Sequence, residues 1–155
     1  MAAIKSLTGS GWLKDADDNF QSLSSLTGLH ITKFTFDTAA NDATSPTPVS
    51  NKTVAAHPLA VTIPDNAIVI GGSIDCIAAV TSDGSATVAI HLVNANDLLT
   101  ATGKASLAIK AQLPLAAVIS QPIKLEAAKA VTVTVGTAAL TAGKINGYII
   151  WIEGE

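Results

Sequence analysis

The chain has 155 residues, of which 48% are hydrophobic and 14% are charged, and its formal net charge is -3. A chain of this length buries roughly 68% of its unfolded surface, so we expect one domain with a normal core and a flanking segment. All nine basic residues are lysine, which argues against an arginine-rich nucleic-acid surface. The charged share is about half the average, which predicts an exterior covered by an oligomer or a large partner. The alternative is an alanine-rich surface without a partner.

Residues 1–28 are predicted to form an N-terminal arm. Asp15 could cap a short helix that carries Phe20, although the serines that follow weaken this pattern. A mobile arm, or an arm docked on a partner, is an equally good interpretation. Trp12, which has glycines on its N-terminal side, and Phe20 are the candidate docking residues, because aromatic anchors often dominate interface energy.

Residues 29–56 are predicted to form one strand followed by a linker. The strand covers residues 29–37 and places Phe34 and Phe36 on one face. The following residues up to position 56 have no apolar period and include two prolines, so we expect an extended linker. Fully stretched, this linker would span up to about 60 Å and could reach a neighbouring subunit.

Residues 57–155 are predicted to form the β domain, because strand patterns recur at short intervals without a long helical period. Asp83-Gly84 predicts a hairpin turn, and Gly71-Gly72 predicts a bulge or a bend where a strand crosses between sheets. Residues 94–102 are expected to form a loop or one helical turn. Before the closing segment, the predicted strands cover residues 57–64, 67–80, 86–93, 107–110 and 122–126.

The closing segment, AVTVTVGTAALTAGKINGYIIWIEGE, is the most informative part of the chain. Its valines alternate with threonines and then, after a turn of small residues, a second strand follows, so we predict a β-hairpin. The second strand is apolar on both faces, which a small antiparallel domain rarely needs for its own core. We therefore expect part of it to face another subunit. The candidate subunit-interface residues are Tyr148, Ile149 and Trp151, of which Trp151 fits a core position as well.

The predicted fold class is all-β. The eight or nine expected strands, separated by short turns, favour a two-sheet antiparallel sandwich of the jelly-roll type over a barrel, with the N-terminal arm attached to it.

No catalytic, cofactor-binding or metal-binding site is predicted. Asp15, Asp17 and Asn19 match the opening of a calcium-binding EF-hand loop, but phenylalanine and leucine stand where the loop needs its glycine and its glutamate. The three histidines are far apart, without zinc-ligand spacing. No nucleophile motif or phosphate-binding glycine loop is present, so we do not expect an enzyme.

Other local features favour ordinary explanations. Cys76 lies in an apolar run and is expected to be a buried thiol, and a single cysteine cannot form a disulfide within the chain. Asn51-Lys52-Thr53 is formally a glycosylation sequence, but without a secretion signal it is best explained by chance. We expect neither a signal peptide nor a membrane span from this pattern.

From Pro58 to the C-terminus the chain resembles the small head decoration, or cement, proteins of tailed bacteriophages. The resemblance rests on IPDNAIVIGGSIDCIAAVTSDGSATVAIHL, ANDLLTATG and VTVTVGTAALTAGKINGYIIWIEG. It implies a jelly-roll-like β domain that forms homotrimers on the outer surface of the head, often with an N-terminal arm that contacts the capsid. The expected location is thus the virion surface, after synthesis in the host cytoplasm, and the expected partner is the major capsid protein. Residues 1–56 match no family.

The expected function is therefore a capsid-stabilising virion protein. The alternative is a carbohydrate-binding or receptor-binding β-sandwich of a head fibre or tail-associated protein. That alternative needs exposed aromatic rings, and the sequence supplies few of them.

Overall fold

The computed structural model describes residues 6–8, 12–14, 20–22, 28–44, 46–115 and 121–154. The chain forms two compact units, residues 1–30 and residues 31–155.

The first unit contains a three-stranded antiparallel sheet in the order β1-β2-β3. The helix expected around Phe20 is wrong at this position, because Phe20 begins strand β3 and pairs with Lys14. Asp15, its expected cap, lies outside the described residues. The serines around this segment disfavour a helix interior, because their hydroxyls compete for backbone hydrogen bonds. The strand bounds are β1 Ser6–Thr8, β2 Trp12–Lys14 and β3 Phe20–Ser22.

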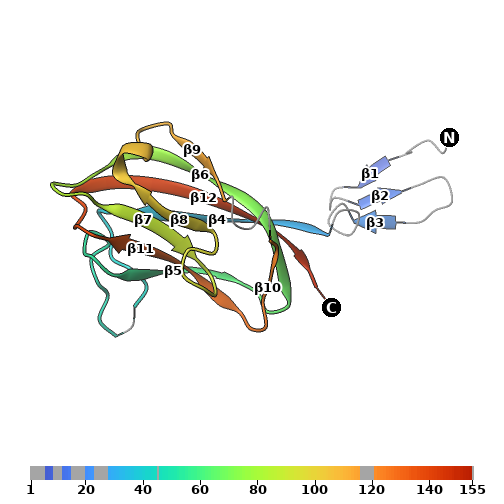
Figure 1. The fold of residues 1–155 in the computed structure, drawn as a ribbon. Helices are drawn as coiled ribbons and strands as arrows, with labels where there is room; N and C mark the ends of the chain where they lie inside the picture. Colours follow the sequence, from blue (N-terminus) through green and yellow to red (C-terminus); the bar gives the residue numbers. More distant parts are fainter. Residues whose placement is uncertain are drawn as a thin grey trace. The chain divides into compact units, whose positions relative to one another are not determined.

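The second unit is a sandwich of two antiparallel sheets (Figure 1). One sheet has the order β10-β6-β12-β4, with β9 also paired to β6, and the other has the order β5-β11-β7-β8. Between the sheets lies one core of aliphatic side chains with two phenylalanines. The strand bounds are β4 Leu29–Asp37, β5 Ala56–Ile63, β6 Ala67–Thr81, β7 Thr87–His91, β8 Leu99–Gly103, β9 Gln112–Pro114, β10 Ile123–Lys124, β11 Lys129–Gly136 and β12 Ala142–Glu153.

The pairing of these strands is that of a jelly roll. The first strand of the sandwich, β4, pairs with the last, β12, and β5 pairs with β11. Inside these pairs, β6 pairs with β9 and β10, and β7 pairs with β8. This nested order, first with last, is what a long antiparallel ribbon adopts when it wraps around a common core. The predicted fold class is confirmed.

Both predicted hairpins are wrong. The strands on either side of Asp83-Gly84, β6 and β7, belong to opposite sheets, and so do β11 and β12 of the closing segment. The two connections instead lie against each other at one end of the sandwich. There the Ser82 hydroxyl donates to the Ala139 carbonyl at 2.6 Å. A turn sequence shows where the chain reverses, but not which sheet receives the next strand.

Three further predictions change in detail. The crossing expected at Gly71-Gly72 is wrong and the bulge is correct, because β6 stays in one sheet and its register against β12 shifts next to Gly71. Residues 99–103 form strand β8 rather than a loop. The Asp97 carboxylate accepts backbone N–H groups from residues 92, 93 and 94, which tightens the turn before β8. Residues 107–110, predicted as a strand, follow the short 3-10 helix Lys104–Ser106 instead.

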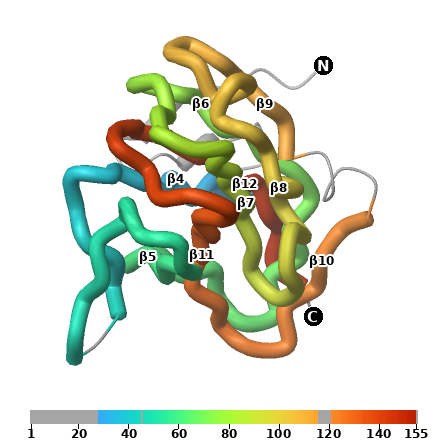
Figure 2. The backbone as a smooth tube through the Cα atoms, turned by 60° about the vertical axis from the view of Figure 1, so that its left-hand side comes forward, coloured from blue at the N-terminus to red at the C-terminus, as the bar shows by residue number. Residues whose placement is uncertain are grey.

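The expected extended linker is also wrong. Residues 38–55 fold back on themselves as a loop beside β5 (Figure 2), with a β-bridge between Asn41 and Ser50. Asp42 and Asn51 of this loop are buried. The sequence shows no apolar period here because polar contacts, rather than hydrophobic ones, hold the loop in place.

Gly147 of β12 is a packing requirement of the core. A Cβ atom at this position would overlap the ring of Phe34, which is 1% exposed on the neighbouring strand β4. The phenyl ring thus occupies the space that any other residue at position 147 would need.

We predict that Gly147→Ala lowers the free energy of unfolding by about 1–3 kcal/mol, because the added methyl group overpacks the core against Phe34. The control is Gly103→Ala, where the added Cβ would meet no atom within 4 Å. Urea unfolding of both variants measures the difference. Equal stability of the two variants would contradict this account.

Candidate functional site

The closing strand β12 has one buried face and one half-exposed face. Ile149 is 0% exposed and Trp151 is 9% exposed, and both belong to the core between the sheets. The Trp151 indole N–H also donates to the Thr32 hydroxyl at 2.9 Å. The expectation that Ile149 and Trp151 lie at a subunit interface is therefore corrected, because both side chains are part of the core. Tyr148 lies on the opposite, outer face and stays a candidate.

The register between β4 and β12 divides this outer face into a polar half and an apolar half. Asp37 pairs with Lys144 at 3.0 Å, and the Thr35 hydroxyl donates to Asn146 at 2.8 Å. The next pair is Lys33, whose ammonium lies 5.8 Å from the centre of the Tyr148 ring. Continuing in steps of two residues, Ile31 falls opposite Ile150. The pKa of the Asp37 carboxyl group is lowered, mainly by the hydrogen bond from the Ala39 N–H and then by Lys144.

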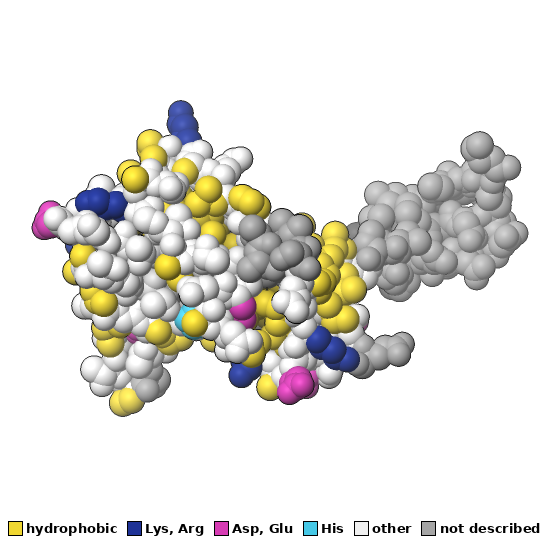
Figure 3. Space-filling view, viewed as in Figure 1, with side chains coloured by type: hydrophobic (Ala, Val, Ile, Leu, Met, Phe, Trp, Pro, Cys, Tyr) yellow, Lys and Arg dark blue, Asp and Glu magenta, His cyan; other side chains and the backbone are white. Residues whose placement is uncertain are grey.

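Five residues form an apolar surface that we call the outer patch. Ile31 is 64% exposed, the others are half-buried, and Ile152 pairs directly with Ile68 of β6. Figure 3 shows hydrophobic side chains at the end of the sandwich where β12 finishes, with lysine and acidic side chains beside them. The outer patch consists of Ile31, Ile68, Tyr148, Ile150 and Ile152.

A buried polar cluster closes the loop of residues 38–55 onto the sandwich. His57, at the start of β5, is fully buried, and its Nδ1 lies 3.2 Å from Asp42 Oδ2. Its Nε2 lies 2.9 Å from the carbonyl oxygen of Thr53. Both ring nitrogens thus face acceptors, so the imidazole ring joins the Asp42 carboxylate to the backbone of Thr53.

Asp42 also organises the loop around itself. Its second carboxylate oxygen accepts the backbone N–H groups of Thr44 at 3.0 Å and Val49 at 2.9 Å. Burial by itself raises the pKa of this carboxyl group, but the hydrogen bonds from Val49, Thr44 and His57 outweigh burial and lower it to about 2. The ionised carboxylate is therefore the form that the fold stabilises.

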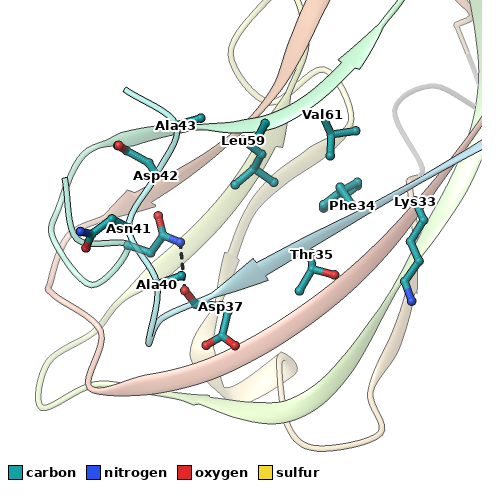
Figure 4. Close-up of a pocket in the computed structure, with 12 residues that line it drawn as sticks. Lys33, Phe34, Thr35, Asp37, Ala40, Asn41, Asp42, Ala43, Leu59 and Val61 are labelled. Atoms are coloured by element: carbon teal, nitrogen blue, oxygen red, sulfur yellow. Dashed lines mark hydrogen bonds between the residues drawn. The ribbon is translucent and has the colours of Figure 1, made fainter. Parts of the chain in front are cut away.

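A groove lies between β4 and β5, next to this loop (Figure 4). Its volume is about 550 Å³, within the usual range of ligand sites. Asn51 lines it, is 2% exposed, and donates from Nδ2 to the Asp37 carbonyl at 2.9 Å. Asn51 Oδ1 has no hydrogen-bond partner, and it is the single such buried side-chain nitrogen or oxygen in the part of the chain that the structure describes.

The described residues contain no cluster of metal ligands, and none of their helices is long and apolar enough to cross a membrane. Asp97 caps a turn, and Cys76 is a buried thiol, as predicted, whose pKa is raised by burial and then by Asp75. The buried side chain of Asn51 argues that its glycosylation sequence is a chance match.

The two candidate docking residues lie in the first unit. Trp12 begins β2 and pairs with Thr8 and Ser22, while Phe20 begins β3. Their side chains lie outside the described part of the structure, so their role stays a prediction.

Sequence reasoning missed Asp42, Asn51 and His57. His57 alternates with Leu59 on the inner face of β5, and this buried position was the one local signal of a polar partner. Asp42 and Asn51 gave no signal, because only the folded loop brings them together.

No protein-family model and no curated protein sequence matches this chain. Chains of solved structures do match it. A chain of the acidic stable capsid structure of Helicobacter pylori bacteriophage KHP30 aligns with a TM-score of 0.54 and 13% identity over 82% of this chain and 89% of its own. A chain of the capsid of Ralstonia phage GP4 aligns with a TM-score of 0.55 and 16% identity, over 81% and 86%.

A third chain, from the cyanophage Pam1 capsid asymmetric unit, aligns with a TM-score of 0.53 and 13% identity, over 81% of this chain and 84% of its own. At such low identity the similarity establishes the fold. The protein therefore has a fold that also occurs in phage capsids, and the fold extends over most of its length.

We predict that His57→Ala lowers the free energy of unfolding by about 3–5 kcal/mol, because it leaves the Asp42 carboxylate buried without its partner. The double variant Asp42→Ala/His57→Ala should lose less than the sum of the single losses. His91→Ala, at a half-buried histidine of β7, is the control and should lose less than about 1 kcal/mol. Additive losses in chemical denaturation would show that the two side chains are not coupled.

Acid should weaken the fold through Asp42. Its pKa of about 2 in the folded state lies below the ordinary 3.8, so the stabilisation is complete above about pH 4 and is lost as pH falls through 2. Asp42→Asn should be less stable at neutral pH but show a smaller decline between about pH 4 and 2. Thermal unfolding across this range tests it, with the exposed Asp65→Asn as a control that keeps the wild-type decline. An unchanged decline in Asp42→Asn would contradict the assignment.

Proposed function

We propose that this protein is a virion structural protein that decorates the outer surface of a bacteriophage head as a homotrimer and stabilises the assembled capsid. It has no catalytic role in this proposal. Its partners are two further copies of itself and the major capsid protein.

The observation that carries the proposal is the shared jelly-roll fold. Three chains from phage capsid structures align over more than four fifths of this chain. The sequence resemblance to head decoration proteins points the same way and rests on different evidence, the strand rhythm and the closing segment.

The outer patch supports self-association. It brings Ile31, Ile150 and Ile152 together on one sheet face, where a monomer gains nothing from exposing them. We place the trimer contact there, with Tyr148 at its polar border. This replaces Ile149 and Trp151, which are buried in the core.

A trimer can attach firmly without one strong site. Threefold symmetry presents each contact three times, and the second and third contacts form at high effective concentration. A protein that binds only where coat subunits are correctly juxtaposed stabilises the shell over its dissociated subunits by mass action. We assign Trp12 and Phe20, in the first unit, to the contact with the coat.

The alternative, a carbohydrate-binding or receptor-binding sandwich, is less well supported. Such a site needs exposed aromatic rings. Among residues 31–44, 46–115 and 121–154, Tyr148 is half-buried and every other phenylalanine, tyrosine or tryptophan ring is buried. No specific observation favours this alternative.

The proposal is tested by mixing purified protein with heads of the same phage that lack it. Sedimentation should recover the protein with the heads in a copy number that is a multiple of three, and decorated heads should release DNA at a higher temperature than bare heads. Protein that stays in the supernatant would refute the proposal.

We predict that Ile150→Glu converts the trimer to a folded monomer, because the buried charge opposes association at the outer patch. Light scattering should change from three times the 15.7 kDa chain mass to one. Thr100→Glu, which adds the same charge at an exposed position of β8, should remain trimeric. A trimeric Ile150→Glu protein would place the contact elsewhere.

A further inference from the structure

We propose that the free edge of β4 is a docking site for an extended segment of the coat protein, which joins the sheet as an additional strand. This proposal rests on the function proposed above and identifies the contact on the sandwich. It assigns a role to the groove between β4 and β5.

The backbone of β4 is open on the side away from β12. The Thr38 N–H donates to the Gly143 carbonyl at 3.1 Å, so even-numbered residues of β4 bond toward β12 in this antiparallel pair. The N–H and C=O groups of Lys33 and Thr35 therefore point away from the sheet. Within residues 28–44, 46–115 and 121–154, β4 has β12 as its one neighbour in the sheet, and nothing bonds to these groups. An exposed row of this kind recognises another extended backbone.

The groove lies beside this edge. It is lined by Lys33, Thr35 and Asp37 of β4, and by Asn51 of the loop. Asn51 Oδ1 has no hydrogen-bond partner but is itself buried, so a docked strand does not reach it. The open backbone edge of β4 is therefore the feature on which the proposal rests.

The edge of β5 across the groove is partly covered. The Ala43 N–H already donates to the Pro58 carbonyl at 2.8 Å, and Pro58 itself has no N–H to offer. The loop of residues 38–55 thus covers part of β5 and leaves β4 open. Figure 4 shows β4 and β5 on opposite sides of the groove, with Leu59 and Val61 on the β5 side.

A second copy of β4 does not fit this edge. Antiparallel pairing of an edge strand with its own copy is a twofold contact, which closes a dimer and not a trimer. It would also bring the Lys33 ammonium groups of both copies to the same edge, and lysine on an edge strand opposes such pairing. A segment of a different protein satisfies both constraints.

The groove defines the chemistry of that segment. Alternate side chains of an added strand face opposite sides of the sheet. The inward ones would meet Leu59 and Val61 and should be apolar. The outward one beside Lys33, which has no ion-pair partner among the described residues, should be acidic. We therefore expect a coat segment that alternates apolar and polar residues and carries a carboxylate opposite Lys33.

The test is Thr35→Pro, which removes the outward N–H and leaves the backbone bonds to β12 in place, since proline is tolerated on edge strands. The hydrogen bond from the Thr35 hydroxyl to Asn146 is lost in this variant and in its control alike. Thr35→Ala, which keeps the N–H, is the matched control. The probe is the undecorated head. We expect Thr35→Pro to bind at least about tenfold more weakly than wild type and Thr35→Ala to bind within about twofold of it.

Each outcome is decisive. If wild-type protein and Thr35→Pro bind heads equally well, the edge proposal is overturned and the proposed function stands. If the wild-type protein does not bind heads, the proposed function is refuted and this proposal with it. If Thr35→Pro instead lowers the oligomer mass, the occupant is a second copy and the proposal is wrong.

A measurement on the wild-type protein covers the case in which Thr35→Pro fails to fold. Amide hydrogen exchange of Lys33 and Thr35 should slow at least about tenfold when heads are added, because new backbone bonds protect these amides. Unchanged exchange with bound heads overturns the proposal. For the acidic partner, Lys33→Glu should bind about tenfold more weakly than Lys33→Arg, and equal binding of these two variants would refute a carboxylate at this position.

Discussion

The sandwich depends on the insertion of β12 between β4 and β6. This strand, the last in the chain, bonds on both edges and contributes Ile145 and Ile149 to the core. Until it is in place, β4 has no neighbour in its sheet among the described strands. The nested pairing therefore requires the most distant parts of the chain to meet, and the entropy of closing that long loop is offset only when the whole core forms.

The same insertion determines the surfaces that we assign to assembly. Because β12 has one buried face, its outer face must carry Tyr148, Ile150 and Ile152, and the register places Ile31 beside them. Because β12 occupies one edge of β4, the other edge is left open along the groove. The outer patch and the free edge of β4 thus both follow from the placement of β12, and a change of register would move both.

The Asp42–His57 pair gives the groove a defined wall. A buried carboxylate is costly unless its hydrogen bonds are satisfied, and here the N–H groups of residues 44 and 49 donate to Asp42, while the carbonyl of residue 53 lies against the other side of the His57 ring. The loop that results covers part of β5, orients Asn51 toward the groove and leaves β4 free. Polar contacts thus fix the shape of the loop beside the groove, whose β5 side is apolar.

The sequence by itself determined the strands with strong alternation, such as residues 29–37 and 129–136, because the period of side-chain burial is a local property of the backbone. It also showed that residues 148–152 are apolar on both faces. Only the tertiary structure decided that β11 and β12 lie in opposite sheets, that Ile149 and Trp151 face the core, and that His57 meets Asp42. The reason is physical: a turn fixes where the chain reverses, whereas the partner of a strand and the face that it buries depend on residues far away in the chain.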